Sequence, residues 1–493
     1  MDLITLIALL IDHLFYKITA ALTNSSTFTN KANTSDEVSS SNFNHKRLLS
    51  VTLALPGYSW LQFSAKMPGF RYCACPESKR MLLGYGVVKR FVTSGNDRFN
   101  HIRKPIQLLQ RDWIQLDPEN TGLQPQALLA FAFDPQDRMV NSWQDLPNTI
   151  FEIPAVLLQQ KQAQLGITFT CFTDTGQPDA KTQTLWRFIL SNIVENLTTS
   201  PLKLQIISNN KPLERIAANP TAPHWLKLVN KAKTYIHKQK LHKVVLTRHI
   251  QVQALHAFDP TLIMGHLAIR YPNCTHVAFD MNLEVSKPQN RVLVAASPEH
   301  LMIVRAGTVT CEALAGTVPR ILAHNSISKH NKALLYSPKS LQEHALVVGH
   351  IATILREYCT QVQVPDTPQI MNLRFVHHLQ SLITGRLTNV HNLIDLVAHL
   401  HPTPAVGGVP TPEALQWLKN YEMHQRGWYT GVIGWMTPNG DGEFTVLLRC
   451  AILNGMQANL FAGAGIVAGS DPVAELEETE LKLQTMLEVL QDV

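Results

Sequence analysis

The sequence lacks the features that are typical of disulfide-rich secreted proteins, zinc fingers and nucleic-acid-binding proteins. Its 493 residues contain only seven cysteines, an odd number, and no Cys-x-x-Cys pair of the kind that binds zinc. We therefore expect reduced thiols and a cytoplasmic location. Charged residues make up only 16% of the chain, the net charge is +6, and the basic residues are not interleaved with aromatic ones. Nucleic-acid binding is therefore not expected.

Long apolar runs are also missing. The first segment, residues 1–23, is apolar and helix-like, but its uninterrupted stretch, Leu3–Ile11, is too short to span a bilayer. Three interpretations of residues 1–23 stay open: an extension of little consequence, a remnant targeting sequence, or an amphipathic helix in weak contact with a membrane surface. Residues 24–44 are rich in Ser, Thr and Asn, which predicts a disordered linker. The rest of the chain is expected to be soluble.

The remaining sequence predicts a globular α/β (α+β) protein. Short apolar runs alternate with turn residues from about Arg47 onward, which predicts many strands. These strands arrive in runs with helices between the groups, a pattern that favours a large mixed or antiparallel sheet core flanked by helices over a strict βαβ repeat. We predict helices at 181–197, 225–240 and 343–362. The chain divides into an N-terminal extension (1–45), the N-terminal half of the fold (46–222) and a catalytic region (223–493).

The stretch 461–482 is the most informative part of the sequence. Its glycines predict a flexible loop, and Asp471, followed by proline, is suited to cap a helix. Glu475, Glu478 and Lys482 are then spaced so that their side chains lie on one face of that helix. Two carboxylates beside a glycine-rich turn suit a divalent cation together with an anionic ligand. The alternative is an ordinary solvated acidic helix.

Four more polar residues stand at the ends of predicted strands or helices. Lys243 opens a buried strand, Glu299 follows one, and Arg449 ends another, while Glu343 lies at the start of a helix. Each residue alone has a structural explanation, such as protection of a strand edge, a cap or a surface ion pair.

Taken together and in order, these residues belong to motifs that resemble a known family. The motifs are Lys243, Ser297-Pro-Glu299, Glu312-Ala-Leu-Ala-Gly-Thr317, Glu343-His344, His378-Leu, Leu400-His-Pro-Thr-Pro-Ala-Val-Gly-Gly408, Arg426-Gly-Trp-Tyr, Gly440-Asp-Gly-Glu-Phe, Arg449 and the stretch 461–482. From about Pro223 to the C-terminus, the sequence resembles the chorismate-utilising enzymes, which include isochorismate, salicylate, anthranilate and aminodeoxychorismate synthases. The resemblance implies the chorismate-binding fold of that family.

Two of the motifs point to one branch of the family. Residues 400–408 and the segment Tyr429-Thr-Gly-Val-Ile-Gly-Trp435 resemble the isochorismate synthases, whereas the amide-forming members typically carry Pro-x-Gly-Thr-x-x-Gly-Ala-Pro in the first place. The resemblance therefore implies an isomerase that acts on chorismate without a glutaminase subunit. The long N-terminal half suits the menaquinone-type members. A salicylate synthase or a siderophore-pathway isochorismate synthase remains the alternative.

The resemblance also assigns roles to individual residues. Isomerisation of chorismate adds water at C2 and expels the C4 hydroxyl, so it needs a base, an acid and a clamp for carboxylates. By resemblance Lys243 is the base and Glu299 the acid, and burial would favour the neutral form of each. The expected Mg²⁺ ligands are Glu343, Glu475 and Glu478. The residues expected to bind the substrate are Thr317, His378, Ala405, Arg449, Gly463, Gly465 and Lys482.

Overall fold

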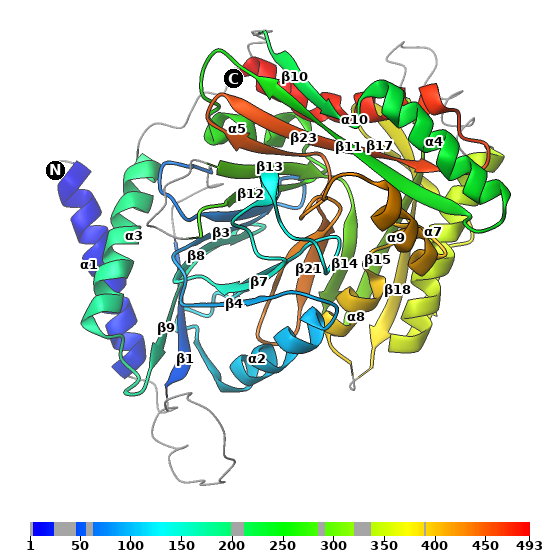
Figure 1. The fold of residues 1–493 in the computed structure, drawn as a ribbon. Helices are drawn as coiled ribbons and strands as arrows, with labels where there is room; N and C mark the ends of the chain where they lie inside the picture. Colours follow the sequence, from blue (N-terminus) through cyan, green and yellow to red (C-terminus); the bar gives the residue numbers. More distant parts are fainter. Residues whose placement is uncertain are drawn as a thin grey trace.

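The computed structural model describes residues 3–23, 46–55, 63–198, 212–283, 291–319, 337–388 and 391–493. The predicted linker at 24–44 lies outside these ranges. Within them, two large sheets pack against each other and helices surround the pair (Figure 1).

The first sheet has 13 strands within the described residues and, in that part of the chain, is antiparallel apart from the β1–β5 pair. Its order is β10 (Glu214–Asn219), β11 (Lys243–Gln253), β23 (Gln457–Ile466), β22 (Cys450–Asn454), β13 (Arg291–Ser297), β12 (Thr275–Asp280), β2 (Arg71–Cys75), β3 (Arg80–Tyr85), β8 (Val156–Lys161), β9 (Gln164–Thr173), β1 (Arg47–Ala54) and β5 (Trp113–Leu116), with β19 (Gly408–Val409) beside β11. Strands from 46–222 and from 223–493 alike contribute to this sheet.

The second sheet has 10 strands among the described residues. Its order is β16 (Cys359–Gln363), β18 (Val376–Leu387), β15 (Thr308–Pro319), β14 (His300–Arg305), β21 (Gly442–Val446), β20 (Val432–Met436), β6 (Ala127–Phe131), β7 (Thr149–Ile153) and β4 (Lys89–Thr93), with β17 (Gln369–Asn372) beside β18. The predicted architecture, a large and mostly antiparallel sheet core flanked by helices, is confirmed.

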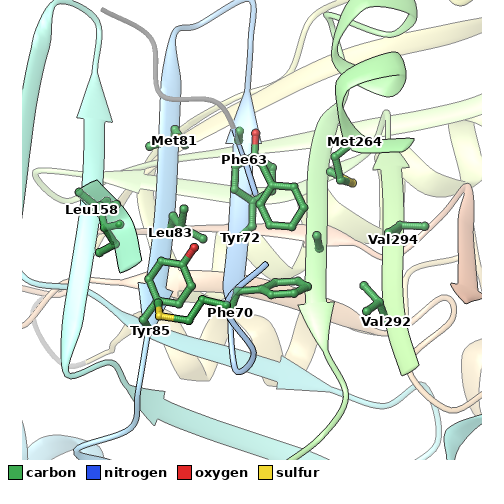
Figure 2. Packing of buried hydrophobic residues seen from close by; sticks show 14 of the residues in the cluster. Phe63, Phe70, Tyr72, Met81, Leu83, Tyr85, Leu158, Met264, Val292 and Val294 are labelled. Atoms are coloured by element: carbon green, nitrogen blue, oxygen red, sulfur yellow. The ribbon is translucent and has the colours of Figure 1, made fainter. Parts of the chain in front are cut away.

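Both faces of the first sheet are buried, because successive side chains of a strand point to opposite faces. On β12, Val277 and Phe279 pack in the cluster between the two sheets, where the ring of Phe279 lies 5.0 Å from that of Trp428. Ala278, between them, belongs to the cluster on the other face. Figure 2 shows this second cluster, in which side chains of β2, β3, β8 and β13 meet Met264 of helix α5 (Pro260–Arg270).

Helices cover the outer faces of the two sheets and their ends. They are α2 (Arg98–Asp112), α3 (Ala180–Thr198), α4 (Ala222–His237), α7 (Pro338–Tyr358), α8 (Leu393–Leu400), α9 (Thr411–Tyr421) and α10 (Pro472–Asp492). The helix predicted at 181–197 is α3 and that at 225–240 is α4. The helix predicted at 343–362 is α7, which begins earlier because Ser337 caps it, accepting a hydrogen bond from the Ser340 N–H, and which ends where β16 begins.

Helix α1 (Leu3–Thr23) packs against α3 and β1. Its side chains Leu14, Phe15 and Ile18 are buried in the same core cluster as the outer face of the first sheet. In the part of α1 whose side chains are described, residues 11–23, the apolar face is therefore covered by the protein itself. None of the helices in the described ranges combines the length and the apolar character needed to cross a membrane.

We predict that Phe70→Ala lowers the free energy of unfolding by about 3–5 kcal/mol, because it removes a buried ring that packs edge-on against Phe63 with 5.0 Å between the centroids. Urea unfolding would measure this change. Leu255→Ala is the control: this side chain is 71% exposed, and we expect a change within about 0.5 kcal/mol. Equal effects of the two substitutions would contradict the packing described here.

Candidate active site

A cavity lined by both sheets gathers most of the residues that the sequence singles out. Its walls come from β11 and β23 of the first sheet, β15 and β18 of the second, and helices α7 and α10. The predicted site residues that line it are Lys243, Glu299, Glu343, His378, Ala405, Arg449, Gly463, Gly465, Glu478 and Lys482. Glu475 does not line it, and the side chain of Thr317 lies outside the described residues, although its backbone pairs with His378.

Lys243 is the first residue of β11, and its side chain is 1% exposed. Its Nζ lies 2.8 Å from Oε1 of Glu343, which extends from the second turn of α7. Removing an ammonium group from water is costly unless a partner compensates, and this carboxylate supplies that partner. Sequence reasoning gave the two residues separate roles and did not predict the ion pair.

Gly463 and Gly465 lie in strand β23, so the expectation of a flexible loop at these two residues is wrong. They pair with Thr247 and Val245 of β11. A Cβ atom on Gly465 would lie 2.8 Å from Oε1 of Glu343 and 2.9 Å from Cε of Lys243. A side chain at position 465 would displace the ends of Lys243 and Glu343, so glycine there leaves room for their ion pair.

Helix α10 begins as predicted, with the side chain of Asp471 accepting hydrogen bonds from two backbone N–H groups of the first turn. Lys482 donates from Nζ to Glu478 at 2.6 Å and to the carbonyl oxygen of Gly463 at 2.9 Å. Glu475 lies one turn before Glu478 but is buried away from the cavity lining. Residues three apart differ by about 60° around a helix axis, which is enough to separate the two carboxylates.

Glu299 lies two residues after the end of β13. Its backbone is fixed by a hydrogen bond from Val446 N–H to the Glu299 carbonyl oxygen at 3.1 Å. Burial, with the negative charge of Glu312 as a second cause, raises the pKa of Glu299 from 4.5 to about 8. The positive charges of Lys243, Arg449 and Lys482 act in the opposite direction without cancelling the effect. Glu299 is therefore protonated at neutral pH and can donate a proton.

Two further polar side chains complete the charge pattern. Arg449 adopts the left-handed backbone conformation (φ 48°) immediately before β22, an uncommon state for a residue with a side chain, and lines the cavity. Burial lowers its pKa from 12.5. Burial and the charges of Arg449 and Lys482 hold the pKa of His378 well below 6.5, so this imidazole is neutral. The cavity therefore carries three positive side chains, Lys243, Arg449 and Lys482, against the two carboxylates of Glu343 and Glu478. This excess of positive charge suits an anionic ligand.

Several lining residues were given no role by sequence reasoning. Tyr429 lines the cavity with its ring stacked on Phe461, 5.4 Å between centroids, and Thr430 follows it. Val245 and Val406 contribute apolar surface. The motif Arg426-Gly-Trp-Tyr was the available signal for Tyr429, because it is one of the ordered motifs of the family resemblance.

The carboxylates of Glu343 and Glu478 supply the oxygen ligands that Mg²⁺ prefers. In the described part of the chain, no three His, Cys, Asp or Glu side chains are arranged to hold a metal ion, and Glu343 and Glu478 are each paired with a lysine. Mg²⁺ in proteins often takes one or two carboxylates and fills its remaining positions with water and a ligand anion. The donor set on the cavity wall therefore fits this ion.

We predict that the stability of the wild-type protein relative to Glu299→Gln falls as the pH rises. The pKa of Glu299 is raised from 4.5 to about 8 by folding, so its stabilising contribution is fully present below about pH 4.5 and is lost as the pH rises through about 8. The difference between about pH 4.5 and about pH 8.5 should be on the order of a few kcal/mol. Urea unfolding of both proteins at the two pH values measures it, and a constant difference would contradict the raised pKa.

The sequence matches the family described as "Chorismate binding enzyme" over residues 31–491. It is 28% identical over 459 residues to isochorismate synthase MenF of Bacillus subtilis (strain 168), covering 91% of this chain and 94% of that one. It is 31% identical over 407 residues to the salicylate biosynthesis isochorismate synthase of Pseudomonas aeruginosa, covering 80% of each.

The fold has a counterpart among solved structures. The menaquinone-specific isochorismate synthase MenF of Escherichia coli superposes with a TM-score of 0.71 at 23% identity, covering 96% of this chain and 99% of that chain. At this identity the likeness shows the fold alone. The fold and the family match together confirm the resemblance seen in the sequence, and the protein belongs to the chorismate-binding enzyme family.

Proposed function

We propose that the protein is a Mg²⁺-dependent isochorismate synthase that isomerises chorismate to isochorismate. The observation that carries this proposal is the meeting of a buried lysine, Lys243, and a protonated glutamic acid, Glu299, in one positively charged cavity. The names of the relatives in Bacillus subtilis and Pseudomonas aeruginosa support it.

The reaction exchanges one water for another across the ring. Lys243 accepts a proton from the water whose oxygen bonds to C2, the double bonds shift, and Glu299 donates a proton to the C4 hydroxyl, which leaves as water. The base must be a neutral amine, so Lys243 has to leave its ion pair with Glu343 before it accepts the proton. The raised pKa of Glu299 matches the role of the acid.

The remaining side chains bind and orient the two carboxylates of chorismate. Arg449 is suited to bind the enolpyruvyl carboxylate with its forked N–H groups. Lys482 and the backbone near Gly463 and Gly465 lie in the same cavity and hold the same end of the ligand. His378 contributes polar surface, and Ala405 leaves room for the ring. Thr317 is kept as a proposed substrate-binding residue on the family resemblance.

Glu343 and Glu478, with Glu475 beside them on α10, are the proposed ligands of Mg²⁺. The ion would neutralise the ring carboxylate of the substrate when bound. Glu475 is the weakest member of this set because it does not reach the cavity wall.

The proposal includes the setting of the enzyme. We infer that isochorismate serves menaquinone biosynthesis, because the long N-terminal half suits such members and the match to the Bacillus subtilis relative spans almost the whole of both chains. No glutaminase subunit is needed. The seven cysteines are all free, which supports a cytoplasmic enzyme. Ile11, Leu14, Phe15, Ile18 and Leu22 of α1 are buried in the protein, so these side chains are not available for contact with a membrane surface.

Incubation of the purified protein with chorismate and Mg²⁺, followed by identification of the product, tests the proposed reaction. We expect isochorismate in equilibrium with chorismate, and loss of turnover when EDTA removes the divalent ion. Salicylate formed without an added lyase would show a salicylate synthase instead, and nitrogen in a product formed with ammonia would show an amide-forming member.

We predict different defects for two site variants. Lys243→Ala should reduce kcat by at least about 100-fold while chorismate still binds, because it removes the base and leaves the anion-binding groups in place. Glu478→Gln should instead raise the Mg²⁺ concentration needed for half-maximal activity. Titration of Mg²⁺ in activity assays and calorimetric binding of chorismate separate the two effects. Normal activity of both variants would refute the assigned site.

We further predict that kcat/KM falls as the pH rises through about 8, where Glu299 loses its proton. Glu312→Gln should move this decline to lower pH, because the charge of Glu312 opposes ionisation of Glu299. The exposed Glu413 provides the control, and Glu413→Gln should leave the profile unchanged. An unchanged profile for Glu312→Gln would exclude Glu299 as the group that titrates.

A further inference from the structure

A buried ion pair, Glu422–Arg426, adjoins the cavity without lining it. Arg426 donates from Nε to Glu422 Oε1 at 3.0 Å and from Nη2 to Oε2 at 2.6 Å, a forked arrangement. The side chain of Arg426 is 3% exposed and that of Glu422 is 4% exposed. Burial alone would raise the pKa of Glu422, but Arg426 and His424 lower it to about 2, so the carboxylate stays charged.

The same guanidinium reaches two backbone carbonyls that belong to cavity-lining residues. Its Nη2 donates to the carbonyl oxygen of Val245 at 2.6 Å, and its Nη1 donates to that of Val406 at 2.8 Å. Val245 lies two residues after Lys243 on β11, and Val406 follows Ala405 in the segment before β19. One planar side chain therefore bridges two segments of the cavity wall, beside the backbone hydrogen bond from Val245 N–H to the carbonyl oxygen of Gly407 at 3.0 Å.

Glu422 reaches the same strand from the other end of the ion pair. Its Oε1 accepts a hydrogen bond from the hydroxyl of Thr247 and lies 3.2 Å from His424 Nε2. Lys243, Val245 and Thr247 alternate along β11 and so share one face of it. The pair thus holds β11 at two points: the backbone carbonyl of Val245, in the plane of the sheet, and the side chain of Thr247, on the face that carries the proposed base.

We propose that Glu422 and Arg426 are positioning residues, which fix β11 against the segment 403–407 so that Lys243 and Ala405 face the ring of the substrate at a set distance. A pair that served stability alone would need only its mutual contact. Here both carbonyls accept hydrogen bonds from the arginine side chain, so the geometry of the wall depends on the fork as well as on the backbone bond between Val245 and Gly407. The inference rests on the proposed function, because it assumes that Lys243 acts in turnover.

The test compares Arg426→Met, Glu422→Gln and the double variant by thermal unfolding and by steady-state loss of chorismate, below the Tm of each protein. Arg426→Met alone leaves the buried carboxylate of Glu422 without its guanidinium partner and should lower Tm most. The double variant removes both charges and should recover part of that Tm. We expect its kcat to stay about 10- to 100-fold below wild type, with KM changed less than about 3-fold, because the wall remains displaced.

Arg426→Lys sharpens the comparison, because lysine keeps the charge but cannot bridge two carbonyls and a carboxylate in a plane. We expect a smaller loss of Tm and a loss of kcat similar to that of the double variant. The inference is overturned if kcat recovers together with Tm in the double variant, or if Arg426→Lys retains wild-type kcat.

A matched control lies elsewhere in the fold. Arg71 donates from Nε to the buried Glu152 at 2.6 Å, and from Nη1 to the carbonyl oxygens of Phe70 and Asp280, but none of these residues lines the cavity. The double variant Arg71→Met with Glu152→Gln should lower Tm without changing kcat. Because turnover is followed as loss of chorismate, the inference is tested whichever product forms, whereas the identity of the product tests the proposed function.

Discussion

The antiparallel pairing of β11 with β23 is the constraint on which the cavity depends. It brings the first residue of β11, Lys243, beside the end of β23, with Val245 opposite Gly465. The amine passes over a glycine that leaves space for it and reaches Glu343 on α7. A slip of one residue in this register would turn Lys243 to the opposite face of the sheet. Because α10 begins only a few residues after β23 ends, the same register also sets where Glu478 and Lys482 lie.

The charges of the cavity are compatible with burial because most of them are paired. Lys243 pairs with Glu343 between β11 and α7, and Lys482 pairs with Glu478 within α10 while also holding the end of β23. Removing one partner of a buried ion pair lowers the free energy of unfolding by more than the pair contributes to it. The charged residues of the cavity therefore depend on one another. Glu299 differs, because it remains uncharged rather than paired. Lys243 is thus stabilised by an ion pair, whereas Glu299 is buried in its neutral form.

Sequence reasoning succeeded where the signal is local and failed where a distant partner decides. The cap at Asp471, the strand-rich α+β class and the composition of the cavity all followed from residues near one another or from ordered motifs. The glycines of 461–466 read as a loop because glycine is rare inside strands, and nothing nearby in the sequence reveals that Lys243 fills the space beside them. Helical spacing placed Glu475 on the same face as Glu478, but the packing of α10 separates them at the cavity wall.

The N-terminal half of the fold, residues 46–222, supports the cavity although none of the sequence motifs lies in it. Within the described residues, the cavity lining comes entirely from the region 223–493, so 46–222 carries no motif of its own. It nevertheless supports the site from behind: the ring of Trp143 packs 5.2 Å from Phe461 on β23, and a Cβ on Gly427 would lie 2.2 Å from Trp143 Cγ. Gly427 follows Arg426 and has a left-handed backbone (φ 55°). The N-terminal half therefore acts on the chemistry through packing, by holding both the glycine strand and the arginine that binds the cavity wall. Packing of that kind depends on shape rather than on a fixed residue pattern, which is why sequence motifs do not report it.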